Sequence, residues 1–246
     1  MNENTPSMED QARHYDQWWT EEFEIGKLNG YELLRLSEIF RAMAFLDFEF
    51  GIKRGDLEIC DLGCGRGWLS ELLSASGKVT GVDLSAKGVE KASKLWPHID
   101  FRQADILSYT ADRKFDLIVS TEVIEHVTDQ RQFAATVARN LKPGGFVILT
   151  CPNARAKPVW VRDGQVTQPI EDWPSFRELK TLFSGEFEIL IHKTFAFDFS
   201  YLGIYRVLSA PKLLRLLRRT GLLRFYDAFR EAAGIGLHQI LVARRR

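Results

Sequence analysis

A glycine-rich segment, Asp61–Trp68, has residue types that can bind a small ligand through the backbone. It follows an apolar run and precedes a stretch of helical character, so its glycines allow a tight turn and a close approach to the main chain. The third glycine comes one residue earlier than in the dinucleotide fingerprint, and Trp68 would crowd the helix start where a pyrophosphate must lie. Asp61 would repel a phosphate and suits a cationic amino group. The segment therefore favours a ligand with an ammonium group and no phosphate.

Two further carboxylates, Asp83 and Asp105, stand at the ends of the next two apolar runs. A carboxylate at the first of these places accepts hydrogen bonds from both hydroxyls of a ribose. Asp105, with the apolar Ile106 beside it, can hold the amino edge of adenine and one face of its ring. Either acid alone could simply cap a strand. Three strand ends in order, each with a suitable group, indicate one nucleoside-binding edge of a sheet.

The elements that must position these residues alternate along the chain. Strands are predicted at 57–62, 79–84, 99–105, 115–121, 146–151, 187–197 and 238–245, and helices at 8–19, 28–48, 66–77, 85–96, 129–141 and 175–183. This alternation predicts a Rossmann-like, doubly wound α/β sheet. Residues 152–174 contain four prolines and are predicted to form a long loop. Residues 198–236 are predicted to form a helical insertion between the last two strands.

Composition bounds the protein class. The 246 residues, 45% of them hydrophobic, suit one ordinary α/β domain with attachments. Lys plus Arg equals Asp plus Glu at 33 each, so the net charge gives no overall steering toward nucleic acid. Three cysteines without a disulfide pattern indicate reduced thiols and a cytoplasmic protein. The N-terminus lacks the basic start and apolar run of a signal peptide, and no apolar stretch is long enough to span a bilayer.

Five motifs occur in a fixed order within residues 57–153, and a looser similarity extends through 186. They are DLGCGRG, GVDLS, AD, FDLIVSTEVIEHV and LKPGGFVILTCPN. As a set they resemble the class I methyltransferases that depend on S-adenosylmethionine (SAM). The resemblance implies a seven-stranded sheet with the last strand antiparallel, and SAM as the donor that leaves as S-adenosylhomocysteine. It assigns donor contacts to Asp61, Gly63, Gly65 and Gly67 (methionine end), Asp83 and Leu84 (ribose), Asp105 and Ile106 (adenine), and Ser120 and Thr121 (near the sulfonium).

The N-terminal segment 8–19 mixes a histidine, a tyrosine and tryptophans. It resembles the helix that covers the donor in many members of this class, although an ordinary helix edge explains its aromatic residues equally well. We therefore expect residues 1–50 to form an N-terminal helical lid. Residues 51–246 then form the SAM-dependent methyltransferase domain, with the helical insertion at 198–236.

Glu122, Glu125 and His126 follow the fourth predicted strand at helical spacing. If the segment is helical, two carboxylates and an imidazole converge on one face, while Val123 and Val127 point into the core. Three interpretations stay open. The set could hold a divalent metal such as Mg²⁺, His126 could be a general base, or the residues could be structural.

The same E-x-x-E-H set resembles the ubiquinone-biosynthesis O-methyltransferases, within the methyltransferase type 11, 12 and 23 group. More distantly it resembles the small-RNA 2′-O-methyltransferases. In such enzymes the set can hold a divalent metal against substrate hydroxyls. The quinone-type enzymes place a further histidine in a T-H-D-W stretch, but here the matching stretch is I-E-D-W and Glu171 replaces the histidine. This departure weakens the metal interpretation, although a carboxylate can also bind Mg²⁺.

The predicted insertion contains an amphipathic helix. Its basic face carries Lys212, Arg215, Arg218 and Arg219, and its apolar face carries Leu213, Leu214, Leu216 and Leu217. It could be a packed lid, an oligomer contact, or a membrane-surface helix over 211–226 that serves a lipid-like acceptor at the inner membrane face. Because it joins the last two strands, it should begin on the active-site side of the sheet. Nucleic acid is not expected as a partner, since aromatic residues do not interleave with a broad basic surface.

The expected reaction is O-methylation of a hydroxyl on a small or lipid-linked metabolite by in-line displacement. A base near His126 would remove the acceptor proton. N-methylation of a small amine is an alternative, and it requires an acidic or aromatic pocket. A catalytically silent SAM-binding partner subunit is the rival outside enzymes. The sequence does not indicate an oligomeric state.

Overall fold

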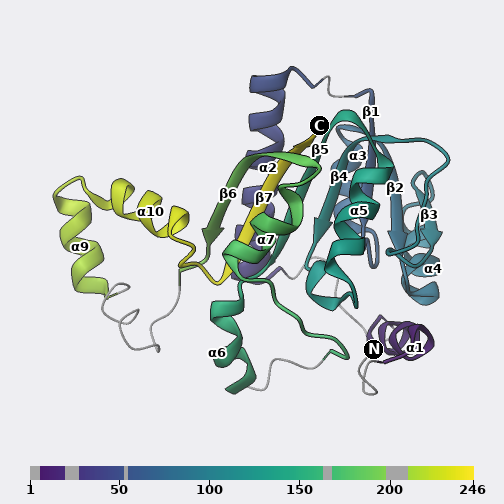
Figure 1. The fold of residues 1–246 in the computed structure, drawn as a ribbon, viewed down its shortest axis with the longest axis horizontal. Coiled ribbons are helices and arrows are strands. Elements are labelled where there is room, and N and C mark those ends of the chain that lie inside the picture. Colours follow the sequence, from purple (N-terminus) through teal and green to yellow (C-terminus); the bar gives the residue numbers. More distant parts are fainter. Residues whose placement is uncertain (1–5, 20–27, 53–54, 163–167, 198–209) are drawn as a thin grey trace.

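The core of the protein is one seven-stranded sheet (Figure 1). The computed structural model describes residues 6–19, 28–52, 55–162, 168–197 and 210–246. The strands are β1 (Leu57–Leu62), β2 (Gly77–Asp83), β3 (Asp100–Gln103), β4 (Phe115–Thr121), β5 (Leu141–Pro152), β6 (Phe187–Phe195) and β7 (His238–Arg245). They are ordered β3-β2-β1-β4-β5-β7-β6, and β7 is antiparallel to both of its neighbours while the other pairs are parallel. The predicted Rossmann-like sheet with an antiparallel last strand is confirmed.

Helices cover both faces of this sheet (Figure 1). The described helices are α1 (Met8–Trp18), α2 (Gly30–Phe50), α3 (Trp68–Ser74), α4 (Ala86–Leu95), α5 (Gln130–Asn140), α6 (Lys157–Arg162), α7 (Phe176–Phe183), α9 (Pro211–Arg219) and α10 (Leu223–Ala232). Of these, α9 and α10 project beyond β6 and do not cover a face of the sheet (Figure 1). Side chains of α2 and α3 pack in one apolar cluster, and those of α5 and α7 pack in a second on the opposite face. The central strand β1 sends Ile59 into the first cluster and Cys60 into the second, and both are fully buried. A strand buried on both faces is typical of a doubly wound fold.

Some predicted boundaries were wrong because local backbone geometry overrides the apolar pattern. Helix α3 begins at Trp68 and not at residue 66, since Gly67 has a φ of 78°, which a right-handed helix cannot contain. The predicted long loop 152–174 contains a short 3-10 helix, Ala154–Ala156, followed by α6. The Asn153 side chain starts that turn by accepting a hydrogen bond from the Arg155 N–H.

The carboxyl ends of β1 to β6 lie along one edge of the sheet, because these strands are all parallel. Helices α1 and α6 lie at this edge in Figure 1. Strand β6 also ends at this edge. Residues 198–209 of the predicted insertion are outside the described residues. Among the described helices, none has the length and apolar character needed to cross a membrane.

Candidate active site

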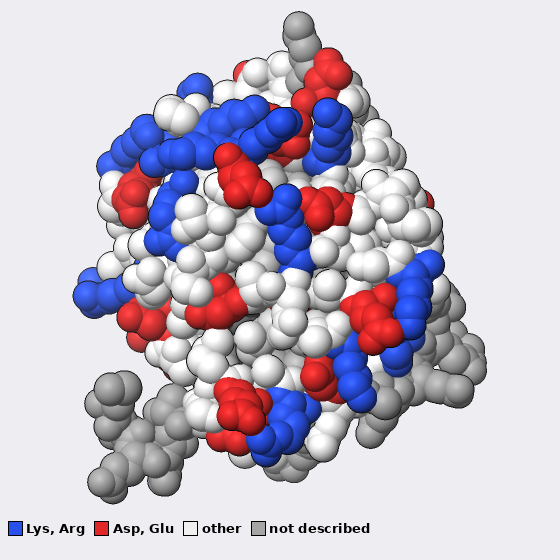
Figure 2. Space-filling view, turned by 90° about the vertical axis from the view of Figure 1, so that its right-hand side faces the viewer, with Lys and Arg blue, Asp and Glu red and all other residues white. Residues whose placement is uncertain are grey.

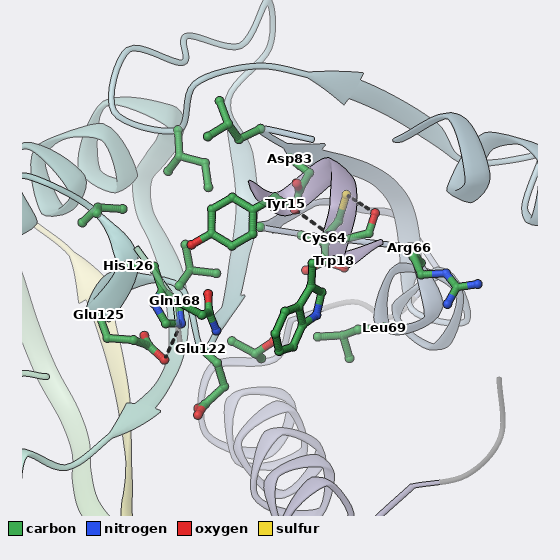
Figure 3. A pocket seen from close by; sticks show the side chains of 18 of the residues that line it. Tyr15, Trp18, Cys64, Arg66, Leu69, Asp83, Glu122, Glu125, His126 and Gln168 are labelled. Atoms are coloured by element: carbon green, nitrogen blue, oxygen red, sulfur yellow. Dashed lines mark hydrogen bonds and ion pairs between the residues drawn. The ribbon is translucent and has the colours of Figure 1, made fainter. Parts of the chain in front are cut away.

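A cavity of about 700 Å³ opens at the carboxyl ends of β1, β2 and β4. Figure 3 shows its walls, with Asp83 on one side and Glu125, His126 and Gln168 on the other. The lining includes most of the predicted donor residues, namely Asp61, Gly63, Gly65, Asp83, Leu84, Asp105, Ile106 and Thr121. Two predicted donor residues, Gly67 and Ser120, are not among the lining residues, and the Ser120 hydroxyl instead donates to the carbonyl of Leu62 at 2.7 Å. The cavity is therefore built on the strand ends that the motifs indicated.

The glycine-rich turn after β1 brings the main chain to the cavity wall. Gly65 has a φ of 52°, and a Cβ there would lie 2.5 Å from the indole of Trp19. The positive φ and the short distance both favour glycine at this position. Residues with a Cβ rarely adopt this φ, and their Cβ would displace the Trp19 indole. The backbone of the turn and the end of α1 thus pack directly on each other.

Asp83 closes the turn from the end of β2. Its carboxylate accepts hydrogen bonds from the N–H groups of Ser85 (2.9 Å) and Gly65 (2.8 Å). Burial raises the pKa of Asp83, and these two N–H groups oppose the shift. Each carboxylate oxygen can accept more than one hydrogen bond, so Asp83 can position the glycine turn and still accept from a ligand.

Asp61 is buried at the end of β1 and accepts a 2.6 Å hydrogen bond from Ser70. Burial raises the pKa of Asp61 to about 7, and the Ser70 hydroxyl only partly offsets this. A buried carboxylate on a cavity wall stabilises a cationic group, because the two charges compensate each other away from water.

Helix α1 covers the cavity. The Asp16 carboxylate accepts from the Ser85 hydroxyl (2.5 Å) and from the Lys87 N–H (3.1 Å), at the N-terminus of α4, where negative charge is favoured. Tyr15 and Trp18 then project into the cavity, with the Tyr15 hydroxyl directed toward the His126 side (Figure 3). That hydroxyl is buried without a hydrogen-bond partner in the described part of the chain. Burial raises the pKa of Tyr15, so it stays a neutral donor.

The segment after β4 does not form the α-helix on which a shared face of Glu122, Glu125 and His126 depended. Glu122 has a φ of 54°, which takes it out of helical geometry, and only Ile124–His126 form a 3-10 helix. Val123 and Val127 were expected to point into the core, but both are only partly buried and line the cavity. The two carboxylates consequently have different surroundings.

Glu122 is held by groups from three other elements. Its carboxylate lies 3.2 Å from the Arg35 guanidinium of α2 and 3.1 Å from His238 Nδ1 of β7, and it accepts a hydrogen bond from Thr150 at 3.2 Å. Burial alone would raise the pKa of Glu122, but Arg35 and then His238 outweigh it and hold that pKa at about 2. Glu122 is therefore ionised on the cavity wall.

The pKa of Glu125 is shifted in the direction opposite to that of Glu122. The Glu125 side chain is almost completely buried. Burial and the neighbouring Glu122 charge raise its pKa well above the ordinary value. Its Oε2 atom has no hydrogen-bond partner among the described residues. Neighbouring carboxylates with pKa values displaced in opposite directions are a common feature of catalytic sites.

His126 presents one nitrogen to the cavity. Its Nδ1 lies 2.8 Å from the carbonyl oxygen of Ile170, which can only accept, so Nδ1 carries the proton of the neutral ring. Burial lowers the pKa of His126, against the effect of that hydrogen bond. Nε2 is then an unprotonated acceptor, 3.7 Å from Glu125 Oε1.

The predicted metal set of Glu122, Glu125 and His126 is not assembled. Glu122 is directed to Arg35 and His238, and no group of three suitable side chains that could hold a metal occurs among the described residues. The sequence did not reveal Arg35 and His238 as part of this site. An arginine beside an apolar helix face and a histidine at a strand start are too common to give a signal.

Residues 168–173 contribute to another wall of the cavity. The Asp172 N–H donates to the Glu125 carbonyl at 2.8 Å, which ties this segment to the 3-10 helix. Glu171 accepts a 2.5 Å hydrogen bond from the Trp173 indole, and the Trp173 ring packs edge-on against Trp160 at 5.4 Å. The two tryptophans and Glu171 all line the cavity. The wall is therefore aromatic and acidic.

The fold and the three strand-end carboxylates define a class I SAM-dependent methyltransferase. Residues 32–222 match the family described as "Methyltransferase domain". The chain belongs to that family of methyltransferases.

The chain is also similar to several curated and solved proteins. The ubiquinone biosynthesis O-methyltransferase of Rickettsia akari is 30% identical over 57% of this chain, and the match spans 57% of that protein's own length. The protein of the same description from Caulobacter vibrioides is 31% identical over 69% of this chain and 75% of its own length. The N-methyltransferase NodS from Bradyrhizobium japonicum, solved with S-adenosylhomocysteine, is 17% identical and covers 100% of this chain and 99% of its own, with a TM-score of 0.59. The cyclase SpnF is 18% identical, with 98% and 97% covered and a TM-score of 0.64. At such identities the solved structures establish the fold alone.

Proposed function

We propose that this chain transfers the methyl group of SAM to a hydroxyl oxygen of a small or lipid-linked acceptor. The observation that supports this most is the 2.8 Å distance between His126 Nδ1 and the Ile170 carbonyl oxygen, which makes Nε2 the acceptor nitrogen of the neutral ring. Oxygen acceptors need a base at this point of the reaction, because a hydroxyl must lose its proton as it is methylated.

In the proposed complex, each part of SAM lies against one strand end. The ammonium of the methionyl part lies at Asp61, the ribose hydroxyls at Asp83, and adenine between Asp105 and Ile106. The Asp105 carboxylate already accepts from the Leu107 N–H at 2.9 Å, which fixes the turn beside the adenine position. When bound, SAM supplies an electrophilic methyl carbon, and the protein's contribution is alignment.

The affinity for SAM should fall as the pH decreases below about 7. In the ligand-free protein Asp61 is protonated below that pKa, but the ammonium of SAM favours the ionised carboxylate. Binding at lower pH therefore requires loss of a proton, and Kd should rise by up to about tenfold per pH unit. Calorimetry over neutral and mildly acidic pH measures this slope.

The Asp61→Asn variant is the matched control for this slope. It keeps the size of the side chain and can still bond to Ser70, but it cannot titrate. It should bind SAM more weakly at neutral pH and show a flat dependence on pH. A wild-type Kd that does not change below pH 7 contradicts the assignment of Asp61 to the ammonium.

The proposed reaction assigns roles to three side chains. His126 Nε2 takes the proton of the acceptor hydroxyl while the acceptor oxygen attacks the methyl carbon. The new C–O bond forms as the C–S bond breaks, and S-adenosylhomocysteine leaves. The Tyr15 hydroxyl and the protonated Glu125 carboxyl donate hydrogen bonds that orient the acceptor, because both are neutral and face the cavity.

N-methylation of a small amine is the second candidate. The acidic and aromatic wall of Glu122, Glu171, Trp160 and Trp173 favours it, since such a wall attracts a cation. The charge of Glu122 is already balanced by Arg35, however, which leaves less attraction for a substrate cation. The similarity to proteins described as O-methyltransferases also supports the oxygen acceptor.

Turnover with a panel of acceptors tests the proposal. The purified chain is incubated with SAM and with matched phenols, alcohols and amines, with and without lipid tails. Released S-adenosylhomocysteine is measured, and the methylated atom is located by fragmentation. We expect oxygen methylation. Methylated nitrogen instead supports the second candidate, and SAM binding without turnover on any acceptor supports a catalytically silent subunit.

A further inference from the structure

Helix α10 carries an apolar stripe that faces away from the body of the protein. Leu222, Phe225 and Phe229 follow at intervals of three and four residues, so they share one helix face. Their exposed fractions are 51%, 60% and 60%. Three large apolar side chains at this spacing on one exposed face are unusual on a soluble surface and indicate an interaction site.

Exposed basic residues lie on the same two helices, α9 and α10. They are Lys212, Arg215, Arg218 and Arg219 on α9 and Arg224 on α10. The guanidinium of Arg224 lies over the Phe225 ring, 4.7 Å from its centre. The two acidic residues of these helices are turned to internal partners, since Asp227 pairs with Arg230 and Glu231 pairs with Lys193. The outer surface of α9 and α10 is therefore both cationic and apolar.

The opposite face of α10 is fixed to the sheet. Arg230 is buried between the rings of Phe197 (4.2 Å) and Tyr226 (4.8 Å). The Thr194 hydroxyl of β6 donates to the carbonyls of Glu231 (3.1 Å) and Arg230 (3.3 Å). These contacts set the rotation of α10, so the exposed stripe is a consequence of how the helix is anchored.

Basic residues are arranged differently elsewhere on the molecule. Figure 2 shows the side of the molecule next to β3 and α4, where Lys and Arg lie close to Asp and Glu. On that side Lys94 pairs with Glu90, and Arg102 pairs with Asp100 and Asp112. These pairs neutralise the basic charges locally. Helices α9 and α10 instead combine basic residues with exposed phenylalanines.

We infer that α9 and α10 dock on the surface of a membrane that contains anionic phospholipid. Phenylalanine and leucine on one face enter the boundary between headgroups and acyl chains, while adjacent Lys and Arg contact anionic headgroups. In Figure 1 the two helices project beyond β6, so a flat surface can approach them. None of their described residues lines the cavity, so docking is independent of the proposed function.

Vesicle flotation tests this inference with the full chain. Vesicles of phosphatidylcholine alone are compared with vesicles that also contain phosphatidylglycerol. We expect binding to the anionic vesicles that weakens at high salt. The Phe225→Ser/Phe229→Ser variant and the Arg215→Glu/Arg219→Glu variant should each lower the partition coefficient by about tenfold or more.

Matched controls separate docking from general effects of substitution. Phe48→Ser removes a phenylalanine of α2 that is 86% exposed, and Arg113→Glu/Lys114→Glu makes the same charge change in the loop before β4. Both controls should float like the wild type, and all variants should keep the wild-type melting temperature and SAM affinity. Absence of flotation, or equal flotation of all variants, overturns the inference. If the wild type is a dimer and the Phe225→Ser/Phe229→Ser variant is not, the surface binds a second copy of the chain, and the membrane inference is overturned as well.

Discussion

We expect the His126→Gln variant to lose about 100-fold in kcat while it keeps the wild-type affinity for SAM. Glutamine can still donate to the Ile170 carbonyl, so the 168–173 wall keeps its contact, but it cannot accept a proton at neutral pH. The donor residues Asp61 and Asp83 lie on the other wall and are unaffected. Steady-state release of S-adenosylhomocysteine and calorimetric SAM binding measure the two quantities separately.

The pH profile of the same variant gives a second readout. Burial places the pKa of His126 below its usual value of 6.5, so the base is unprotonated at neutral pH. The wild-type kcat should fall only as the pH decreases through that lowered pKa, and this decrease should be absent in His126→Gln. A variant with a normal kcat, or with an unchanged acid limb, contradicts the assignment.

Two controls distinguish a base from other roles. His192→Gln changes a histidine of β6 that stacks on Phe176 and does not line the cavity, and it should keep the wild-type kcat. Chelation tests the metal interpretation directly. Activity that survives chelation while His126→Gln is impaired favours the base, whereas activity lost on chelation and restored by Mg²⁺ assigns the segment to a metal.

Most strands were predictable from the sequence because they are short apolar runs, whereas β3 (Asp100–Gln103) is largely polar and shorter than the predicted 99–105. The bounds predicted for β1, β4 and β7 are those of the structure, since all three strands are buried along most of their length. Other errors occur where a single residue has an unusual backbone conformation. Glu122 is the clearest case, because helical spacing of the E-x-x-E-H set suggested a common face and its positive φ removes it.

The meeting of Asp61, Asp83 and Asp105 on one wall of the cavity was predictable for a similar reason, whereas the surroundings of Glu122 were not. Asp61 and Asp83 lie at the ends of β1 and β2, and Asp105 follows the end of β3 by two residues, so the parallel strands bring all three to one edge of the sheet. Two of the partners of Glu122, Arg35 and His238, come from α2 and β7, which lie near opposite ends of the chain. Only the strand order brings β7 beside β5, so no local pattern could indicate that His238 would reach this site.

The Arg35→Met variant should lower the free energy of unfolding by about 2–3 kcal/mol at neutral pH. It leaves Glu122 with a charge on the cavity wall that His238 and Thr150 compensate only in part. Breaking one partner of a buried pair costs more than removing both, so the Arg35→Met/Glu122→Gln variant should recover most of the loss. Urea unfolding of the wild type, both single variants and the double variant gives the coupling energy.

The pH dependence of this difference follows from the sign of the Glu122 shift. Its pKa is about 2 in the folded protein, below the usual 4.5, so the stabilisation by Arg35 is fully present above about pH 4.5. It is lost as the pH falls toward 2, and the difference between wild type and Arg35→Met should shrink in that range. Arg41→Met is the matched control on the same helix, because the Arg41 side chain is exposed and its partner Glu38 keeps a second ion pair with Lys193. If Arg35→Met is no less stable than Arg41→Met, then Arg35 does not hold the Glu122 charge.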